Sequence, residues 1–211
     1  FQAFVVVGAR VSMLIMSLTP PLTALFGLII LGERMTVINI LGMMLTISGI
    51  ALVILGRPVK GKRFSLNFPL TGLFLALGGA AGQALGLVLS KLGMGDLNAF
   101  MSTQSRVIAG IVGFSLVFFV IRRWGNVWKA VRHKQAMSRI SIGAFFGPFL
   151  GVSFSLLAVK FTTTGIASTL MALTPVMIIL PARYIFKEKI TTKEVIGAFI
   201  AVTGVVVFFV F

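Results

Sequence analysis

The sequence predicts an all-α membrane protein, an inverted-repeat helix bundle with about seven transmembrane helices here and ten in the full chain. The first reason is composition: 58% of the residues are hydrophobic, the mean hydropathy is +1.09 and only 4 residues are acidic. A soluble domain is closer to half apolar and a quarter charged. The second reason is a series of apolar segments of about 20 residues, the length that crosses a bilayer. The third is a repeat inside the chain.

Seven segments are predicted to cross the membrane as helices, because a helix satisfies every backbone polar group within one segment. They do not show the alternating polarity of membrane β-barrel strands. Phe1 to Ala3 align with the end of the fifth segment, so we expect the chain to open on the tail of another helix. The segments are Val11–Leu31, Val37–Leu55, Pro69–Ser90, Ala99–Ile121, Ile140–Lys160, Gly165–Phe186 and Val195–Phe211.

The first two segments and the last two are copies of one pattern. A shift of 155 positions places Thr19-Pro20 on Thr174-Pro175 and Glu33 on Glu188. Five crossings separate equivalent positions, so the two copies enter the membrane from opposite sides and the repeat is inverted. The same shift aligns Met16 with Met171, Leu18 with Leu173, Thr36 with Thr191, Gly42 with Gly197 and Gly49 with Gly204.

The chain begins at Phe1, inside an apolar stretch, and we therefore expect a fragment that lacks its first helices. Five helices in each half would give ten in the complete molecule. Residues 1–56 are then the C-terminal part of the first repeat, 57–68 a basic connecting loop and 69–211 the second repeat.

The net charge of +15 does not indicate a nucleic-acid partner, because the Lys and Arg residues gather in short segments between the apolar spans. One face holds 15 of the 19 Lys and Arg residues, in loops 56–68, 122–139 and 187–193 and at Arg10 and Arg183. Cationic loops stay cytoplasmic. This face is therefore predicted to lie inside, with both termini of the ten-helix molecule outside.

The residue types argue against an enzyme, a metal site and a cofactor. The chain has no cysteine, and its one histidine, His133, is predicted to be a solvated residue of a basic loop. No carboxylate falls within a predicted span, whereas a membrane-embedded enzyme would need facing His, Ser, Asp or Cys groups.

Pro20 and Pro175 lie in the middle of spans and in register between the copies. A proline cannot donate to the carbonyl four residues back, so the carbonyls of Met16 and Met171 lose their helical partners. Freed carbonyls at a kink form binding sites and hinges in many transporters, which favours a cavity or gating role. The alternative is a packing kink satisfied by nearby hydroxyls, those of Ser17, Thr19 or Thr174.

Glycines recur on single helix faces and predict close helix packing rather than ligand contact. Two groups are spaced by four residues and two pairs by seven. They are Gly78, Gly82 and Gly86; Gly143, Gly147 and Gly151; Gly42 and Gly49; and Gly197 and Gly204.

Glu33 and Glu188 each end a span, which favours a structural role in the turn over proton transfer. Thr36 and Thr191 follow them and are good caps for the next helix. Thr191 and Glu194 also have the spacing of a capping box.

Arg106 is the most unusual charge, since it lies roughly two turns into a span. Such an arginine either snorkels to the near surface or binds an anionic substrate. Gln83, Ser153 and Ser168 are further polar candidates for a substrate cavity, although each could instead hydrogen bond between helices.

The string Leu18-Thr19-Pro20, Leu31-Gly32-Glu33-Arg34, Gly42 and Gly49 resembles the EamA domain of the drug/metabolite transporter superfamily. The second copy, with Leu173-Thr174-Pro175, Lys187-Glu188-Lys189, Gly197 and Gly204, resembles the same motif. The resemblance implies two inverted five-helix repeats around a central cavity and both termini in the cytoplasm. The loop charge predicts the opposite location, with both termini outside.

The sequence therefore predicts a multi-pass transporter of the cell (inner) membrane that moves small organic metabolites or drugs by alternating access, as an exporter. The alternative is a non-transporting scaffold or regulator with the same fold. The expected partners are a small-molecule solute and the lipid bilayer, with a second copy of the chain as a candidate.

Overall fold

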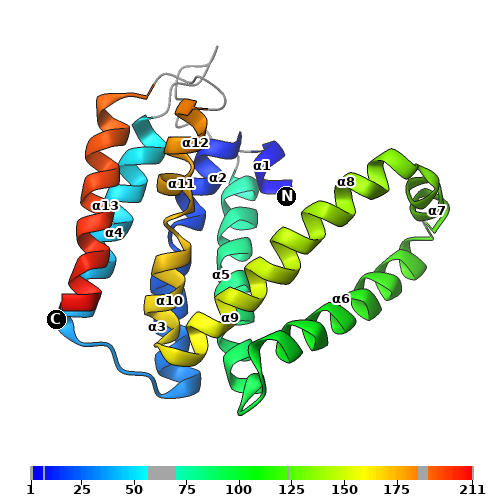
Figure 1. Ribbon diagram of the computed structural model, residues 1–211, viewed down its shortest axis with the longest axis horizontal. Helices are drawn as coiled ribbons and strands as arrows, with labels where there is room; N and C mark the ends of the chain where they lie inside the picture. The colour runs from blue at the N-terminus through cyan, green and yellow to red at the C-terminus, as the bar shows by residue number, and fades with distance from the viewer. Residues whose placement is uncertain (1, 7, 57–69, 123, 185–189, 211) are drawn as a thin grey trace. The chain divides into compact units, whose positions relative to one another are not determined.

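In the computed structural model, the described residues are 2–6, 8–56, 70–122, 124–184 and 190–210. This part of the chain is helical, without a strand, which confirms the all-α fold (Figure 1). The helices form two compact units. Unit 1 comprises Phe1–Leu89 and Thr162–Phe211, and unit 2 comprises Ser90–Phe161. The predicted basic loop, residues 57–68, lies outside the described residues.

Unit 1 combines helices from the two ends of the chain. From the first half it contains α1 (Gln2–Val6), α2 (Gly8–Met16), α3 (Thr19–Leu31), α4 (Val37–Gly56) and most of α5 (Leu70–Met94). From the second half it contains α10 (Thr164–Met171), α11 (Thr174–Met177), α12 (Ile179–Tyr184) and α13 (Thr192–Val210). Both copies of the repeat therefore lie in one compact unit.

α4 and α13, the last helices of the two copies, run antiparallel and in close contact (Figure 1). A Cβ atom on Gly42 would lie 2.9 Å from the carbonyl oxygen of Gly204. One on Gly197 would lie 2.7 Å from the carbonyl oxygen of Gly49. At these distances only hydrogen fits, so the four glycines are what allows the two backbones to approach. This is the type of contact that their seven-residue spacing predicts.

The pairing of these glycines has the symmetry of an inverted repeat. Gly42 is equivalent to Gly197 in the two copies, yet it packs on Gly204, and Gly49 packs on Gly197. Equivalent positions cross over in this way when a two-fold axis passes between two antiparallel helices. α3 and α10 are antiparallel as well, because Thr23 contacts Ser168 while the later residue Gly27 faces the earlier residue Thr164.

Unit 2 is built around α6 (Ala99–Ile121), which runs beside α9 (Val152–Phe161). The ring of Phe100 lies 6.3 Å from that of Phe149 and 6.2 Å from that of Phe154, between centroids. α7 (Trp124–Arg132) and α8 (Lys134–Ala144) connect the two helices at the end away from Phe100 (Figure 1).

The prediction of a loop over Arg122–Arg139 was wrong. Among the described residues of this segment, Arg122 and His133 fall outside helices, because α7 and the first turns of α8 occupy the rest. α7 was missed because it is short and strongly basic, and an apolar-span criterion rejects such a segment. His133 begins α8: its Nδ1 accepts a hydrogen bond from the backbone N–H of Ala136, at 3.2 Å.

The fifth predicted span is confirmed as a continuous helical stretch, Lys134–Phe161, with a π-helical segment at Phe145–Gly151. Pro148 lies inside this segment and has no N–H to donate, so the regular ladder of hydrogen bonds cannot pass through it. The sequence analysis did not anticipate the π-helix.

Five stretches in the described part of the chain are long and apolar enough to cross a membrane. They correspond to the first five predicted spans, and α13 corresponds to the seventh. Their limits are Val11–Leu31, Val37–Gly56, Leu70–Met94, Ala99–Ile121 and Lys134–Phe161.

The sixth predicted span, Gly165–Phe186, is not one continuous helix. It is divided into α10, α11 and α12. Pro175 explains the first division, because it has no N–H to donate to the carbonyl of Met171.

Candidate functional site

Unit 1 contains two equivalent helix breaks. The first separates α2 from α3 at Ser17 and Leu18, and the second separates α10 from α11 at Ala172 and Leu173. The backbone N–H of Leu18 donates to the carbonyl of Ile15 at 3.0 Å, and that of Leu173 donates to the carbonyl of Leu170 at 3.2 Å. The two breaks therefore use the same tight turn at residues that the repeat aligns.

At both breaks a threonine hydroxyl bonds to the carbonyl that the proline leaves without a helical donor. Thr19 Oγ1 donates to the carbonyl of Met16 at 2.7 Å, and Thr174 Oγ1 donates to that of Met171 at 2.8 Å. These bonds stabilise the kinks, as the packing alternative predicts. A carbonyl oxygen has two lone pairs, so each carbonyl can still accept a second hydrogen bond.

The breaks differ in exposure and in one side chain. Pro20, Thr19 and Ser17 are buried, whereas Pro175 is half-buried and Thr174 is exposed. Ser17 Oγ donates to the carbonyl of Leu14 at 2.6 Å. The aligned residue in the second copy is Ala172, which cannot form this bond. The first break is thus held by two hydroxyls and the second by one.

A polar contact crosses from α3 to α10 in the interior of unit 1. The hydroxyls of Thr23 and Ser168 lie 3.2 Å apart, and both residues are buried. Thr23 Oγ1 also donates to the carbonyl of Thr19 at 2.8 Å. Ser168, a predicted cavity residue, is thereby connected to the first helix break.

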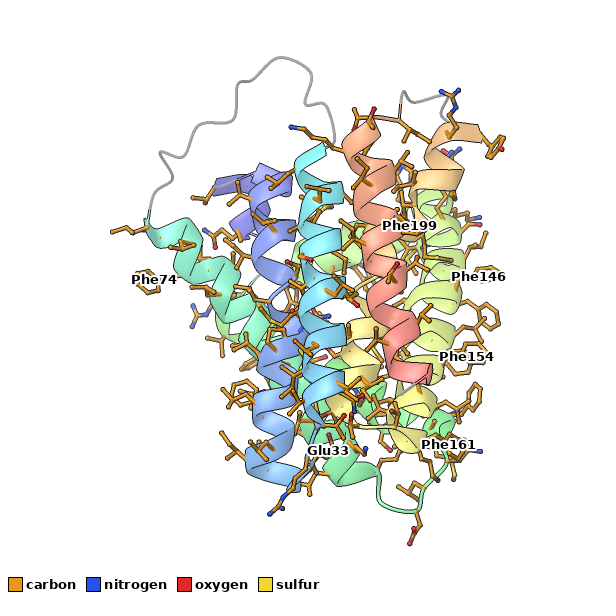
Figure 2. All side chains as sticks on the ribbon, turned by 90° about the vertical axis from the view of Figure 1, so that its left-hand side faces the viewer. Glu33, Phe74, Phe146, Phe154, Phe161 and Phe199 are labelled. Carbon is orange, nitrogen blue, oxygen red and sulfur yellow. The ribbon has the colours of Figure 1, made fainter. Side chains whose placement is uncertain are left out.

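The line of contact between α3 and α10, which we call the α3–α10 seam, ends at Glu33. One oxygen of its carboxylate, Oε2, accepts hydrogen bonds from the backbone N–H and the hydroxyl of Thr164, each at 2.7 Å. Gly32 adopts a φ of 66° at the end of α3, where a left-handed residue turns the chain. A carboxylate at the first turn of α10 is favourable because the N–H groups there lack helical partners. Figure 2 shows Glu33 at one end of the helices.

The structural role that the sequence favours for Glu33 agrees with this geometry, although Glu33 binds another helix rather than its own turn. For the second copy, the capping box is confirmed: Thr191 N–H donates to Glu194 Oε2 at 2.8 Å, and Glu194 N–H donates to Thr191 Oγ1 at 3.3 Å. Thr36 caps α4 by accepting from the N–H of Asn39 at 3.3 Å. Glu188 lies outside the described residues.

The remaining polar candidates lie elsewhere. Gln83 is exposed on α5. Ser153 donates to Thr103 Oγ1 at 3.0 Å and joins α9 to α6 inside unit 2, as its structural alternative predicts. Arg106 is exposed on α6 and donates from Nη1 to Ser90 Oγ at 2.8 Å. The cavity role predicted for these three residues stays a prediction.

At six of the ten predicted packing glycines, an added Cβ would contact no other helix among the described residues. A Cβ on Gly78, Gly82 or Gly86 of α5 would meet nothing within 4 Å, and the same is true at Gly143 and Gly147. At Gly151 it would lie 3.5 Å from the carbonyl oxygen of Phe146, in the same helical stretch. For these six glycines a helix–helix contact stays a prediction.

Sequence reasoning missed Thr23, Thr164 and Ser12. Thr23 lies four residues after Thr19, a spacing that suggests only a local bond to the backbone. The hydroxyl of Ser12 on α2 is buried and has no hydrogen-bond partner within the described residues. Buried polar groups without partners are rare, so Ser12 is a candidate to bind a polar ligand atom.

Large apolar side chains point outward from the helices of both units. Figure 2 shows Phe74 directed away from unit 1, and Phe146, Phe154 and Phe161 directed outward from unit 2. Phe161 is 81% exposed and Phe199 is 74% exposed. Water would penalise such a surface, and a hydrocarbon environment would not. The fold and this surface define a multi-pass membrane protein of the helical-bundle class.

Comparison of the chain with known proteins identifies its family. The model of the EamA-like transporter family matches residues 70–210. The chain therefore belongs to the EamA-like transporter family and is a membrane transporter-type protein. No curated protein matches the chain. The family resemblance inferred from the Thr-Pro, Glu and Gly positions is confirmed.

Among the described residues, no group of three or more His, Cys, Asp or Glu side chains could hold a metal ion.

Proposed function

We propose that the protein exports small organic metabolites or drugs across the cell (inner) membrane, by alternating access between its two inverted repeats. One observation carries the proposal: two identically broken helices are placed antiparallel in a single unit, with polar contacts between them. A broken helix near the bilayer centre offers both a hinge and backbone groups that can bind solute.

The two breaks divide unit 1 into two pairs of half-helices. α3 and α10 lie toward the end marked by Glu33, and α2 with α11 and α12 lie toward the other end (Figure 1). In the proposed cycle each pair is a gate on one side of the membrane. The α3–α10 gate closes through the Thr23–Ser168 and Glu33–Thr164 hydrogen bonds, and it opens when these bonds exchange for bonds to water or solute.

The solute would bind between the gates, where Ser12, Ser17, Thr19 and Ser168 offer hydroxyl groups and Met16 and Met171 offer carbonyls. The described carboxylates of unit 1, those of Glu33 and Glu194, each accept hydrogen bonds at the start of a helix, α10 and α13 respectively. The proposal therefore favours a neutral or zwitterionic solute that forms hydrogen bonds. An enzymatic role is not part of it.

A disulfide across the α3–α10 seam tests the cycle. These 211 residues contain no cysteine, so Thr23→Cys/Ser168→Cys introduces the only thiols in this part of the protein, at positions where the native hydroxyls are 3.2 Å apart. Any cysteine elsewhere in a longer natural chain is first replaced by Ser. In full-length protein reconstituted into liposomes, oxidation should abolish the flux of any transported metabolite, and a reductant should restore it. The physical reason is that a covalent bond prevents the gate from opening.

The matched control is Thr103→Cys/Ser153→Cys, which replaces hydroxyls 3.0 Å apart between α6 and α9 of unit 2. The two single-cysteine variants of the seam control for the substitutions themselves. A cross-linked seam with undiminished flux would contradict the gate. Absence of flux across a broad metabolite panel, even before oxidation, would favour the scaffold alternative. Inside-out and right-side-out vesicles compare the two directions, and faster movement outward is expected.

A further inference from the structure

α7 is a short amphipathic helix between two membrane-spanning stretches. Trp124, Val127, Trp128 and Val131 recur at intervals of three and four residues, so they form one apolar face. Trp124 is 47% exposed and Trp128 is 62% exposed. Two contacts with this face are seen among the described residues of unit 2: the ring of Phe118 lies 6.4 Å from that of Trp124, and the guanidinium of Arg132 lies over the ring of Trp128.

The connections to α7 restrict where it can lie. Two residues join it to the end of α6, where Arg122 has a φ of 55° and turns the chain, and only His133 joins it to α8. α6 and the helical stretch that begins with α8 are both long enough to span a bilayer. Since their ends emerge at a membrane surface, α7 must lie at that surface, and a Trp face is typical of the level of the lipid headgroups.

The charge around α7 has no counterion within unit 2. The described cations Arg122, Arg132, Lys134 and Arg139 are all exposed, and Arg123 and Lys129 add to them in the sequence. No Asp or Glu occurs between Asp96 and Glu188. Asp96 precedes α6, so the length of that 23-residue helix, about 35 Å, separates it from Arg122. The negative partner must come from outside this unit.

Two of these cations, Lys134 and Arg139, lie where a positive charge does not stabilise its own helix. Lys134 begins α8, and Arg139 follows in its second turn. A positive charge near a helix N-terminus is unfavourable, because the helix dipole is positive there. Arg132 has its guanidinium carbon 5.7 Å from the centre of the Trp128 ring, so a cation lies beside the apolar face.

We propose that α7 and the first turns of α8 form an interfacial anchor that binds the headgroup phosphates of anionic phospholipids. The Trp face enters the bilayer to the depth of the first acyl carbons, and the cations contact the negatively charged headgroups around it. Connectivity fixes α7 at the bilayer surface, which selects lipid headgroups rather than free phosphate as the partner.

The two tryptophans of the described chain make the test direct. The sequence contains 2 tryptophans, and both lie on α7, so intrinsic fluorescence reports on this helix alone. Where the natural chain is longer, any additional tryptophan is first replaced by Phe.

The protein is reconstituted into vesicles of phosphatidylcholine alone, or with about a third phosphatidylglycerol, a charge density high enough to attract basic segments. Bromine on shallow acyl carbons should quench the emission more than bromine on deep carbons. Phosphatidylglycerol should shift the emission to shorter wavelength and reduce quenching by aqueous acrylamide.

Charge variants identify the residues. Lys134→Gln/Arg139→Gln should remove the response to phosphatidylglycerol. This double variant keeps Arg132 over Trp128, so the local environment of the fluorescent tryptophan is preserved. The matched control, Arg183→Gln/Lys193→Gln, removes one Arg and one Lys from exposed positions in unit 1 and should leave the response unchanged.

Stronger quenching by deep than by shallow bromine would overturn the interfacial position. Free acrylamide access in both lipid mixtures would overturn it as well. An identical emission in the two mixtures, or a response that survives Lys134→Gln/Arg139→Gln, would overturn the anionic headgroup as the partner. Inorganic phosphate added to phosphatidylcholine vesicles should have no effect, and a full response to it would assign the site to free phosphate instead.

Discussion

At the scale of single residues, polar side chains in this protein are used to bind backbone groups that proline or a helix end leaves without a partner. Thr19 and Thr174 bond to the carbonyls ahead of the prolines, and Glu33 bonds to the first turn of α10. Each bond is worth more in a low-dielectric setting than in water, since an unpaired polar group there is costly.

Glu33 provides the residue-scale prediction. Glu33→Ala should lower the stability of the full-length protein in detergent by about 1.5–3 kcal/mol, because the two donors of Thr164 lose their charged acceptor. Glu33→Gln should cost less, as it keeps an acceptor oxygen. Glu33→Ala/Thr164→Ala should cost less than the sum of the two single variants, since both remove one interaction. Thermal unfolding measures all four proteins.

The control for this cycle is Asp96→Ala, which removes an exposed carboxylate from another turn and should change the unfolding temperature little. Strict additivity of the Glu33 and Thr164 effects would contradict a direct bond between them.

At the scale of helices, the breaks before Pro20 and Pro175 have the same hydrogen-bond pattern although their surroundings differ. The Leu-Thr-Pro sequence therefore determines the kink locally. Helix contacts are different. Gly42 and Gly49 pack tightly, whereas nothing lies within 4 Å of a Cβ at Gly78 and Gly82, although both sets have helical spacing. A glycine face allows close packing, and a partner helix has to be present for it to occur.

Pro175→Ala is the prediction at this scale. Alanine supplies an N–H that can donate to the carbonyl of Met171, so the variant helix should straighten. We expect transport in liposomes to fall by a factor of ten or so, about 1.4 kcal/mol of barrier, with the unfolding temperature unchanged or higher. Pro181→Ala, in α12 and without a counterpart in the first copy, is the matched control. Equal losses of transport and stability in Pro175→Ala would support a purely structural kink.

At the scale of the whole molecule, the inverted repeat brings the ends of the chain together in unit 1. Arg34 precedes α4, and Lys193 lies beside the other end of α4, because Thr191 Oγ1 donates to the carbonyl of Gly56 at 3.0 Å. α4 has 20 residues and spans about 30 Å, the thickness of the hydrocarbon core. The two cations should therefore lie on opposite sides of the membrane.

The prediction at this scale uses single cysteines, because these 211 residues contain none. Any cysteine elsewhere in a longer natural chain is first replaced by Ser. In intact cells a membrane-impermeant maleimide should label Arg34→Cys and leave Lys193→Cys unlabelled, because the face with most of the cations should be cytoplasmic. Both should react after permeabilisation, which is the control for accessibility. Labelling of Lys193→Cys alone would reverse the orientation and agree with the family expectation. Labelling of both would contradict a membrane-spanning α4.

The sequence by itself determined the helical class, the predicted spans other than the sixth, the two helix breaks before Pro20 and Pro175, the capping box and the family. These depend on hydropathy, on proline geometry and on residues close together in the chain. Tertiary structure decided which polar groups meet. Thr23 reaches Ser168 across 145 positions, and Glu33 reaches Thr164 across 131. Such pairs depend on the relative rotation of two helices, which no local pattern contains. α7 was missed for a different reason. A helix this short and basic is recognised only once the spans on either side of it have been placed.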